Sequence, residues 1–255
     1  MIEEPLTVEE NHDSNEPIHW EEPKRDWTLW LAGGGCILIL CAAAFIGSII
    51  AFGPDSIQRI IPNPIQNANE IPRTLTQSNT MGDPNAPVYI VEFGDFQCPY
   101  CLRFWSETEA QLIEEYVNTG KVYFEYRSVG EFLGPESAWA AEGAYCAGDQ
   151  EKFWEFHDTL FTNWTGENVG DFTKDKLIQY AESLDLDMNE FESCITSGKH
   201  EATVEQDAAD ADSAGVHATP TFFINGVKVE GAQPFAIMKQ YIEDALNGNL
   251  NTLNG

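Results

Sequence analysis

Residues 88–101 decide the fold and read VYIVEFGDFQCPYC. The first six of these residues form an apolar run with one polar interruption, which predicts a buried strand. Cys98 and Cys101 follow, and the apolar pattern after them continues to Gly120, which predicts a helix. Pro99 fits the first turn of that helix because this position needs no amide donor. The stretch therefore predicts a strand that leads into a helix beginning with a Cys-x-x-Cys pair.

The rest of the chain adds strands and helices in an order typical of an α/β protein. Residues 121–127 alternate between apolar and polar side chains, as a second strand does. Asn225-Gly226 is a strong hairpin signal, and it separates two short strands at 221–224 and 227–230. The expected helices cover residues 135–147, 151–163, 173–184, 187–197, 200–214 and 233–247. We therefore expect an α/β sheet with a helical insertion.

The pair of Cys98 and Cys101 carries the chemistry. Cysteines three positions apart at a helix start have sulfurs close enough to form a disulfide. We expect Cys98 to be exposed, near the free amides and the positive end of the helix dipole, which stabilise a thiolate. A thiolate attacks or leaves a disulfide, so Cys98 is expected to form mixed disulfides and Cys101 to resolve them. A zinc site uses the same spacing, but it usually has a second Cys or His pair nearby, and this sequence has none there.

A long stretch without charged residues predicts a single transmembrane anchor at residues 27–53. The alternative is a cleaved signal peptide, but the acidic segment before the stretch is too long and too negative for one. Lys24 and Arg25 immediately precede the stretch, and this bias places the N-terminus in the cytoplasm. Residues 1–26 are then an acidic cytoplasmic tail, and the catalytic domain is periplasmic or extracellular, on the oxidising side of the cell membrane.

Residues 54–80 are rich in proline, asparagine and glutamine and show little hydrophobic periodicity, which is typical of a flexible tether. The folded domain is expected to cover residues 81–249, with its helical insertion at about 131–214. No repeat with a period of about 20 to 50 residues is visible, which excludes solenoids and propellers.

The charge of the chain excludes one class of partner. The sequence has 42 acidic and 13 basic residues, which gives a formal net charge of -29. Phosphate groups repel such a chain, so we expect no nucleic-acid partner. A solvated acidic surface is the simplest explanation of the charge, and adaptation to high salt is the alternative.

A second motif lies far from the cysteine pair, at residues 215–226, and reads GVHATPTFFING. Pro220 stands at the start of a strand, where it donates no ladder hydrogen bond and where a cis peptide bond is tolerated. Residues 91–101 and 215–226 together resemble the DsbA-like thiol-disulfide oxidoreductases of the thioredoxin superfamily, over roughly residues 74–249. The resemblance implies a thioredoxin fold with an inserted helical domain, here preceded by a single transmembrane helix.

The resemblance also implies roles for residues near the two cysteines. It implies a cis bond between Thr219 and Pro220 that faces the cysteine pair and holds the backbone of the substrate. Glu92 occupies the place of a buried acidic residue near Cys101, where it would accept and donate protons. The alternative for Glu92 is a salt-bridged or snorkelling strand residue.

The dipeptide Pro99-Tyr100 between the cysteines departs from the enteric oxidase that names the family, which has histidine in place of Tyr100. A Pro-Tyr dipeptide and a threonine at the position of Thr219 also resemble periplasmic disulfide isomerases. Those isomerases carry an N-terminal dimerisation domain, whereas only a tether stands in its place here. We therefore expect an oxidase rather than an isomerase.

Three residues remain outside the two motifs or at their edge. His217 could approach the sulfur of Cys98 and partly replace the missing histidine, and an exposed loop histidine is the alternative. Cys146 and Cys194 both lie in predicted helices of the insertion. An oxidising compartment favours a structural disulfide between them, which members of the resembled family can have, over two independent buried thiols. Closing a loop of about 49 residues would stabilise the fold by roughly 4 kcal/mol.

The sequence therefore predicts a membrane-anchored oxidoreductase that introduces disulfides into exported proteins by dithiol-disulfide exchange at Cys98-Pro-Tyr-Cys101. The expected substrates are exported protein thiols, and the resemblance implies a quinone-linked membrane partner that reoxidises the site. The lipid bilayer is contacted through residues 27–53, and neither a cofactor nor a metal is expected. The alternatives are a disulfide isomerase or reductase of the same fold, or a metal carrier or chaperone that uses the same cysteines.

Overall fold

The computed structural model describes residues 73–250. The predicted acidic tail at 1–26, the predicted anchor at 27–53 and most of the predicted tether lie outside the described residues. Within residues 73–250, no helix combines the length and the apolar character needed to cross a bilayer.

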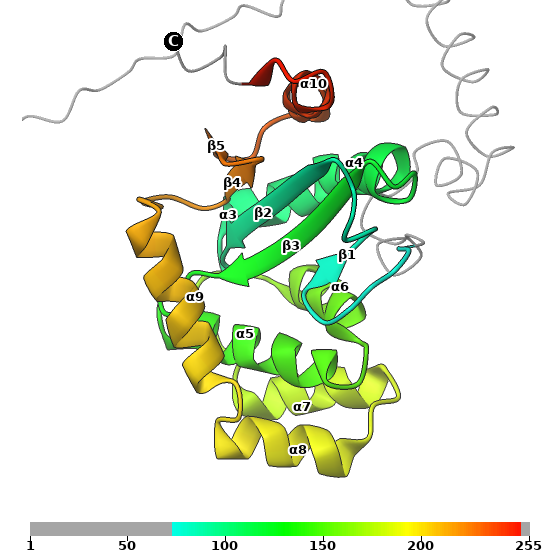
Figure 1. The fold of residues 1–255 in the computed structure, drawn as a ribbon. Helices are drawn as coiled ribbons and strands as arrows, with labels where there is room; N and C mark the ends of the chain where they lie inside the picture. The colour runs from blue at the N-terminus through cyan, green and yellow to red at the C-terminus, as the bar shows by residue number, and fades with distance from the viewer. Residues whose placement is uncertain (1–72, 251–255) are drawn as a thin grey trace, which may run out of the picture. The chain divides into compact units, whose positions relative to one another are not determined.

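A five-stranded sheet with the strand order β1-β3-β2-β4-β5 lies between the helices of the described domain (Figure 1). The strands are β1 (Thr80–Met81), β2 (Val88–Gly94), β3 (Val122–Ser128), β4 (Thr221–Ile224) and β5 (Val227–Glu230). The strands β2 and β3 run parallel, whereas β1 pairs antiparallel with β3, and the β4-β5 hairpin pairs antiparallel with β2. The α/β class expected from the sequence is therefore confirmed.

The side chains of β2 and β3 explain why these two strands are central. The strand β3 alternates, so that Val122, Phe124 and Tyr126 are buried while the side chains between them are partly exposed. The last residue of β2, Gly94, lies directly beneath one of these side chains. A Cβ atom at Gly94 would come within 2.6 Å of the ring of Tyr126, so only glycine fits there.

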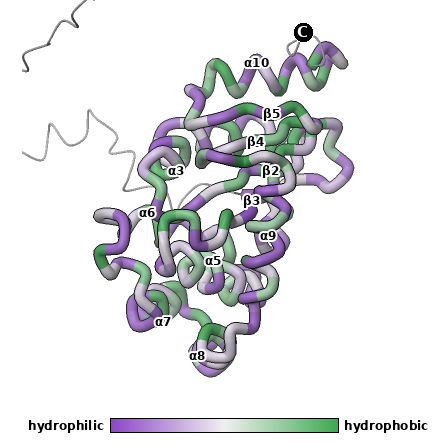
Figure 2. The backbone as a smooth tube through the Cα atoms, turned by 90° about the vertical axis from the view of Figure 1, so that its left-hand side faces the viewer, coloured by the Kyte–Doolittle hydropathy of each residue, from purple (hydrophilic) through white to green (hydrophobic). Residues whose placement is uncertain are grey.

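Five helices lie between β3 and β4 in the chain and form the inserted block. They are α5 (Pro135–Gly148), α6 (Phe153–Asn163), α7 (Lys174–Ser183), α8 (Met188–Ser197) and α9 (Glu201–Ser213). Figures 1 and 2 show α5, α7 and α8 near the β1-β3 end of the sheet and α10 (Phe235–Leu246) near its β4-β5 end. Hydrophobic and hydrophilic residues alternate along α10 in Figure 2, and it buries Met238 and Ile242, one turn apart.

The helix that follows Cys98 is not the uniform α-helix that the periodicity predicts. It consists of α3 (Pro99–Phe104), η2 (Trp105–Glu109), α4 (Ala110–Leu112) and η3 (Ile113–Val117), of which the two η segments are π-helical. A π-helical turn holds one more residue than an α-helical turn. Both ends of η2, Trp105 and Glu109, contact buried charged groups described below, which a periodicity pattern does not reveal. The other helices begin and end within two residues of their predicted bounds.

The tether predicted at residues 54–80 extends too far, because residues 73–80 belong to the folded domain. The guanidinium of Arg73 lies 2.7 Å from Asp158 and 3.0 Å from Glu109, and β1 begins at Thr80. This segment is held by one buried arginine and a two-residue strand, neither of which produces hydrophobic periodicity. Hydrophobic periodicity, which placed the boundary between tether and domain, therefore could not show that residues 73–80 belong to the domain.

Candidate active site

The two cysteines of the motif lie at the start of α3, where Cys98 is the N-cap and Pro99 occupies the first turn. Both cysteines are free thiols in this structure. Cys98 is only 6% accessible and Cys101 is fully buried, so the expectation of an exposed Cys98 is wrong. The exposed residue of the motif is Tyr100, at 55%. Cys98 is shielded because the loop before β4 covers its sulfur.

This loop contains the peptide bond between Thr219 and Pro220, which is cis. The thiol of Cys98 donates a hydrogen bond of 3.3 Å to the carbonyl oxygen of Thr219. The pairing of β2 with β4 sets Phe93 opposite Thr221, and it thereby brings the loop to the end of β2 from which the chain turns into α3. The two motifs of the sequence thus meet at the sulfur of Cys98.

The environment of Cys98 stabilises its thiolate. A hydrogen bond from Cys101 is the largest influence, and together with the side chain of Thr219 and the backbone amides of Tyr100 and Cys101 it outweighs the effect of burial. These interactions lower the pKa of Cys98 from 9.0 to about 6. At neutral pH these interactions favour the thiolate of Cys98, the form in which a cysteine is nucleophilic.

The environment of Cys101 has the opposite effect. Burial raises the pKa of Cys101 well above its usual value, and the hydrogen bond to Cys98 and the charges of Cys98 and Glu92 raise it further. The backbone amide of Asp95 donates a weak hydrogen bond of 3.5 Å to the sulfur of Cys101. Cys101 therefore stays a protonated thiol while Cys98 is a thiolate.

Glu92 lies in β2 and is 2% accessible. Burial, followed by the charges of Glu109 and Cys98, raises the pKa of Glu92 well above its usual value. Within residues 73–250, its Oε2 atom has no hydrogen-bond partner, and no ion pair involves its carboxylate. The environment of Glu92 therefore favours its neutral form, and the salt bridge that was the alternative is not found among the described residues.

A second buried carboxyl group, that of Asp95, was missed by the sequence reasoning. Burial raises the pKa of Asp95 to about 6, although the backbone amide of Gln97 donates a hydrogen bond of 2.8 Å to its Oδ1 atom. Its Oδ2 atom has no partner among the described residues. Its position three residues before Cys98, in the turn between β2 and α3, could have indicated from the sequence that Asp95 lies close to the cysteine pair.

A buried ion cluster joins the beginning of the domain to its core. The guanidinium of Arg73 donates to both oxygens of Asp158, at 2.7 and 2.9 Å, and to Glu109 at 3.0 Å. The Nδ1 atom of His157 lies 3.1 Å from Asp158, and the indole of Trp105 donates to Asp158 at 2.9 Å. Burial opposes ionisation of Asp158, but the hydrogen bond from His157 and the charge of Arg73 lower its pKa. The sequence reasoning missed this cluster because its members are far apart in the chain.

His217 lies on the surface, and the structure does not place it among the main interactions of Cys98. It lies instead near Glu230, whose pKa is lowered mainly by a hydrogen bond from Lys228. The role of His217 in tuning Cys98 therefore stays a prediction.

Cys146 of α5 and Cys194 of α8 form a disulfide, and their Cα atoms lie 5.8 Å apart. The bond links two helices of the inserted block that pack against each other. The pair thus connects residues separated by 48 positions in the sequence.

A cavity of about 540 Å³ opens beside the cysteine pair. Its lining comes from the start of the first helix and from the loops around β4 and β5, and includes Tyr100, Arg103, Glu107 and Thr219. The guanidinium of Arg103 lies 5.2 Å from the centre of the Tyr100 ring and donates a hydrogen bond of 3.2 Å to the carbonyl of Ala232. A peptide segment lying in this cavity would be next to both Cys98 and the cis peptide bond.

Two groups of side chains in residues 73–250 have ligand atoms close enough to bind a metal ion. One group consists of Glu109, His157 and Asp158, but Arg73 already binds both carboxylates. The other group consists of Cys146, Cys194 and His200, and the disulfide occupies both of its sulfurs. The redox pair Cys98 and Cys101 belongs to neither group.

The protein-family profile described as thioredoxin matches residues 74–244. The chain belongs to the thioredoxin family. The solved structure of oxidised BdbD from Bacillus subtilis is similar, with a TM-score of 0.62 and 25% sequence identity over 69% of this chain and 96% of that chain. The probable disulfide bond formation protein D of Bacillus cereus is 32% identical over 66% of this chain and 78% of that protein. Residues 73–250 therefore form a DsbA-like thiol-disulfide oxidoreductase domain.

A similar segment also occurs in much longer proteins. The Na(+)/H(+) antiporter NhaA 1 of Salinispora arenicola is 32% identical over 178 residues, which cover 70% of this chain and 26% of the antiporter. This chain spans about a quarter of the length of the first curated relatives it matches. The antiporter name therefore belongs to longer proteins, and this chain resembles only a small part of each of them.

Proposed function

We propose that this protein introduces disulfides into exported proteins by dithiol-disulfide exchange at Cys98 and Cys101. The observation that carries the proposal is the opposite shift of the two pKa values, lowered to about 6 for Cys98 and raised for Cys101. A thiol of low pKa is a good leaving group, and a stabilised thiolate favours the reduced form of the enzyme. Both effects drive electrons from the substrate into this site.

The exchange proceeds in two steps. A substrate thiolate first attacks the sulfur of Cys98 in the oxidised site, and the bond between Cys98 and Cys101 breaks. Cys101 then takes up a proton, for which the buried carboxyl groups of Glu92 and Asp95 are the nearby donors. A second substrate thiolate attacks the substrate sulfur of the mixed disulfide, and Cys98 leaves as a thiolate. The substrate thereby loses two electrons and the site gains them.

The surroundings of the pair assist these steps. Thr219 and Pro220 hold the substrate backbone beside Cys98, because the carbonyl of Thr219 already contacts its sulfur. Pro99 starts α3 and so directs the backbone amides of Tyr100 and Cys101 at the Cys98 sulfur. The exposed ring of Tyr100 contacts the substrate in the cavity beside it.

The protein acts outside the cytoplasm and is held in the bilayer by residues 27–53. The apolar segment and the basic residues before it support this placement. The disulfide between Cys146 and Cys194 supports it as well, because such bonds persist in oxidising compartments. A quinone-linked membrane protein reoxidises Cys98 and Cys101 after each cycle.

Oxidation of a reduced, unfolded protein with several cysteines tests the proposal. One equivalent of the oxidised enzyme should form one disulfide in the substrate and should itself become reduced at Cys98 and Cys101. A variant with both site cysteines replaced by serine should be inactive, whereas a variant without Cys146 and Cys194 should still transfer its disulfide. If the substrate stays reduced with the wild-type enzyme, the proposal is wrong.

An isomerase is the second candidate, because Tyr100 and Thr219 match the isomerase pattern and Tyr100 borders a cavity that can hold a peptide. The same assay separates the two activities when its substrate is a protein with scrambled disulfides and the enzyme is supplied reduced. An isomerase restores the native pairing under these conditions, whereas an oxidase acts only in the first assay.

A further inference from the structure

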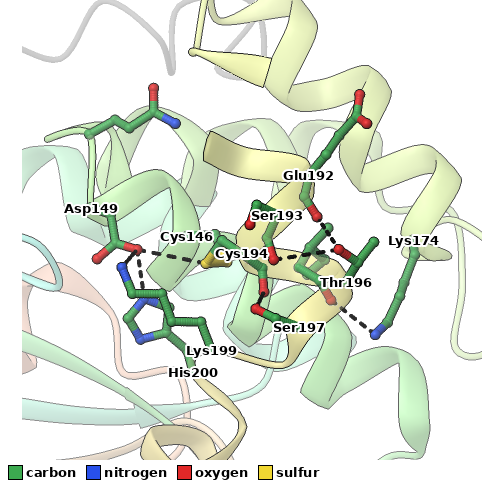
Figure 3. The surroundings of a disulfide bond; sticks show 12 residues. Cys146, Asp149, Lys174, Glu192, Ser193, Cys194, Thr196, Ser197, Lys199 and His200 are labelled. Carbon is green, nitrogen blue, oxygen red and sulfur yellow. Dashed lines mark hydrogen bonds and ion pairs between the residues drawn. A yellow bond between two sulfur atoms is a disulfide. The ribbon is translucent and has the colours of Figure 1, made fainter. Parts of the chain in front are cut away.

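The disulfide between Cys146 and Cys194 lies next to an imidazole and a carboxylate (Figure 3). The ligand atoms of Cys146, Cys194 and His200 all lie within 4.8 Å of one another. The Oδ2 atom of Asp149 lies 3.7 Å from the sulfur of Cys194 and 2.9 Å from the Nε2 atom of His200. Two sulfurs, one imidazole and one carboxylate thus converge on a single point of the inserted block.

The ends of two helices build this arrangement. Asp149 is the C-cap of α5, three residues after Cys146, and α8 ends shortly after Cys194. Gly198 follows α8 in the left-handed conformation, with φ of 64°, and so ends the helix and turns the chain back. The turn brings His200 onto Asp149, and the ring of Tyr145 lies 5.7 Å from the imidazole.

A cavity borders the site. A cavity of about 430 Å³ is lined by both cysteines of the disulfide and by Asp149 and Lys199. The ammonium group of Lys199 lies 2.8 Å from Asp149, and the side chain of His200 keeps 17% of its surface exposed. Cys146 and Cys194 are themselves only 1% and 6% accessible, so a dithiol or a metal ion would approach the sulfurs through this cavity.

The chemistry of these groups fits zinc. Thiolate and imidazole are the ligands that zinc prefers, at about 2.3 Å for sulfur and about 2.0 Å for nitrogen. Tetrahedral coordination at these lengths sets ligand atoms about 3.3 to 3.8 Å apart. The 3.7 Å between the sulfur of Cys194 and Asp149 lies in that range, and breaking the disulfide lets the two sulfurs move apart to it.

We propose that reduction of the Cys146–Cys194 disulfide converts this place into a zinc site formed by Cys146, Cys194 and His200, with the carboxylate of Asp149 in the fourth position. An external dithiol supplies the two electrons and is oxidised to its own disulfide, and both cysteines become thiols. Zinc then binds both sulfurs and displaces their two protons. Lys199 leaves Asp149 when the metal binds, because the metal takes over the charge of the carboxylate.

The exchange preserves the connection between α5 and α8. In the oxidised protein the disulfide holds the two helix ends together, and in the reduced protein the metal holds the same residues. The inserted block therefore has two alternative crosslinks, one for oxidising and one for reducing conditions.

Zinc binding is tested with zinc ion alone, in a variant whose Cys98 and Cys101 are both serine, so that only the second pair binds metal. The protein is prepared oxidised and after reduction by a phosphine, and bound zinc is measured by competition with a chromophoric chelator. We expect one zinc per reduced chain and none per oxidised chain. Zinc should also raise the melting temperature of the reduced protein and leave that of the oxidised protein unchanged.

Two substitutions in the same turn provide the matched comparison. His200→Ala removes a ligand and should weaken zinc binding by at least about tenfold, whereas Lys199→Ala removes only the competing cation and should not weaken it. If the reduced protein loses its helical circular dichroism, one equivalent of zinc should restore it. The proposal is overturned if the reduced protein binds no zinc, if zinc fails to restore lost structure, or if His200→Ala binds zinc as tightly as Lys199→Ala.

Discussion

The sulfur of Cys98 lies 3.3 Å from the carbonyl oxygen of Thr219, although 121 positions separate the two residues in the sequence. The contact has two consequences for the reaction. It restricts access to Cys98, which is only 6% accessible. It also places the carbonyl group of Thr219, which belongs to the cis peptide bond with Pro220, beside the sulfur of Cys98. A substrate must therefore displace or pair with this loop to react.

Alkylation of the reduced protein should modify Cys98 and leave Cys101 unmodified. The pKa of Cys98 is lowered to about 6, so its reaction rate should rise with pH and be half-maximal near that value. Peptide mapping after brief exposure to iodoacetamide, between about pH 4 and about pH 9, measures both sites. Cys101→Ala removes the strongest hydrogen bond to Cys98 and should move the midpoint to higher pH. Equal labelling of the two cysteines would contradict the assignment.

Cys101→Ser should accumulate mixed disulfides with substrate proteins. The Cys98 thiolate still attacks a substrate disulfide, but the thiol that would release the substrate is absent. Non-reducing gels followed by reduction of the excised bands identify the adducts. Cys98→Ser is the matched control and should form none. Absence of adducts with Cys101→Ser would argue against exchange at this pair.

Glu92→Gln should slow the step in which Cys101 changes its protonation state while leaving the alkylation of Cys98 unchanged. Burial raises the pKa of Glu92, so the folded protein keeps a proton that the unfolded chain releases above its usual pKa of 4.5. The buried carboxyl group of Glu92 therefore lowers the free energy of unfolding of the wild type near neutral pH, but not below about pH 4. Urea unfolding should show the variant gaining stability relative to the wild type as pH rises. A stability difference that is independent of pH would show that Glu92 is ionised in the fold.

The protein reduced at Cys98 and Cys101 should melt at a higher temperature than the oxidised protein. The folded pKa of Cys98, about 6, lies below its usual value of 9.0, so this stabilisation is complete above about pH 9 and is lost as pH falls toward 6. The margin should therefore shrink on acidification. It should also be smaller than in a site with histidine at the position of Tyr100, because tyrosine supplies no positive charge.

Reduction of the Cys146–Cys194 disulfide would also change the melting temperature. Both cysteines are therefore replaced in the oxidised and the reduced protein before the two are compared. An oxidised form that is clearly the more stable, with a potential near about -270 mV, would assign the protein to the reductases. The melting experiment thus decides the direction of electron flow independently of any substrate.

Arg73→Met should destabilise the domain by about 3 to 5 kcal/mol, because it leaves two buried carboxylates without their cation. Lys239→Met is the matched control, since Lys239 pairs with Glu115 on the surface, and its effect should be much smaller. Urea unfolding of both variants measures the difference. Equal effects would mean that the ion pairs of Arg73 contribute no more than a surface pair.

Local patterns were enough to predict most of the fold. The strand at Val88–Gly94, the hairpin around Asn225-Gly226 and the helices of the insertion all carry periodicities or turn residues within a few positions of one another. The pattern failed at residues 73–80, where a buried arginine and a short strand hold the chain. It also failed in η2, where contacts with Asp158 and Arg73 accompany the π-helical turn.

The sequence by itself determined the α/β class and the order of the elements, and it predicted Cys98 and Cys101 as the reactive pair, because spacing and periodicity are properties of neighbouring residues. Only the tertiary structure decided that Cys98 is covered by Thr219 and that Cys146 lies against Cys194 and His200. These relationships join segments tens of residues apart. They depend on how strands pair and helices pack, which no local pattern specifies.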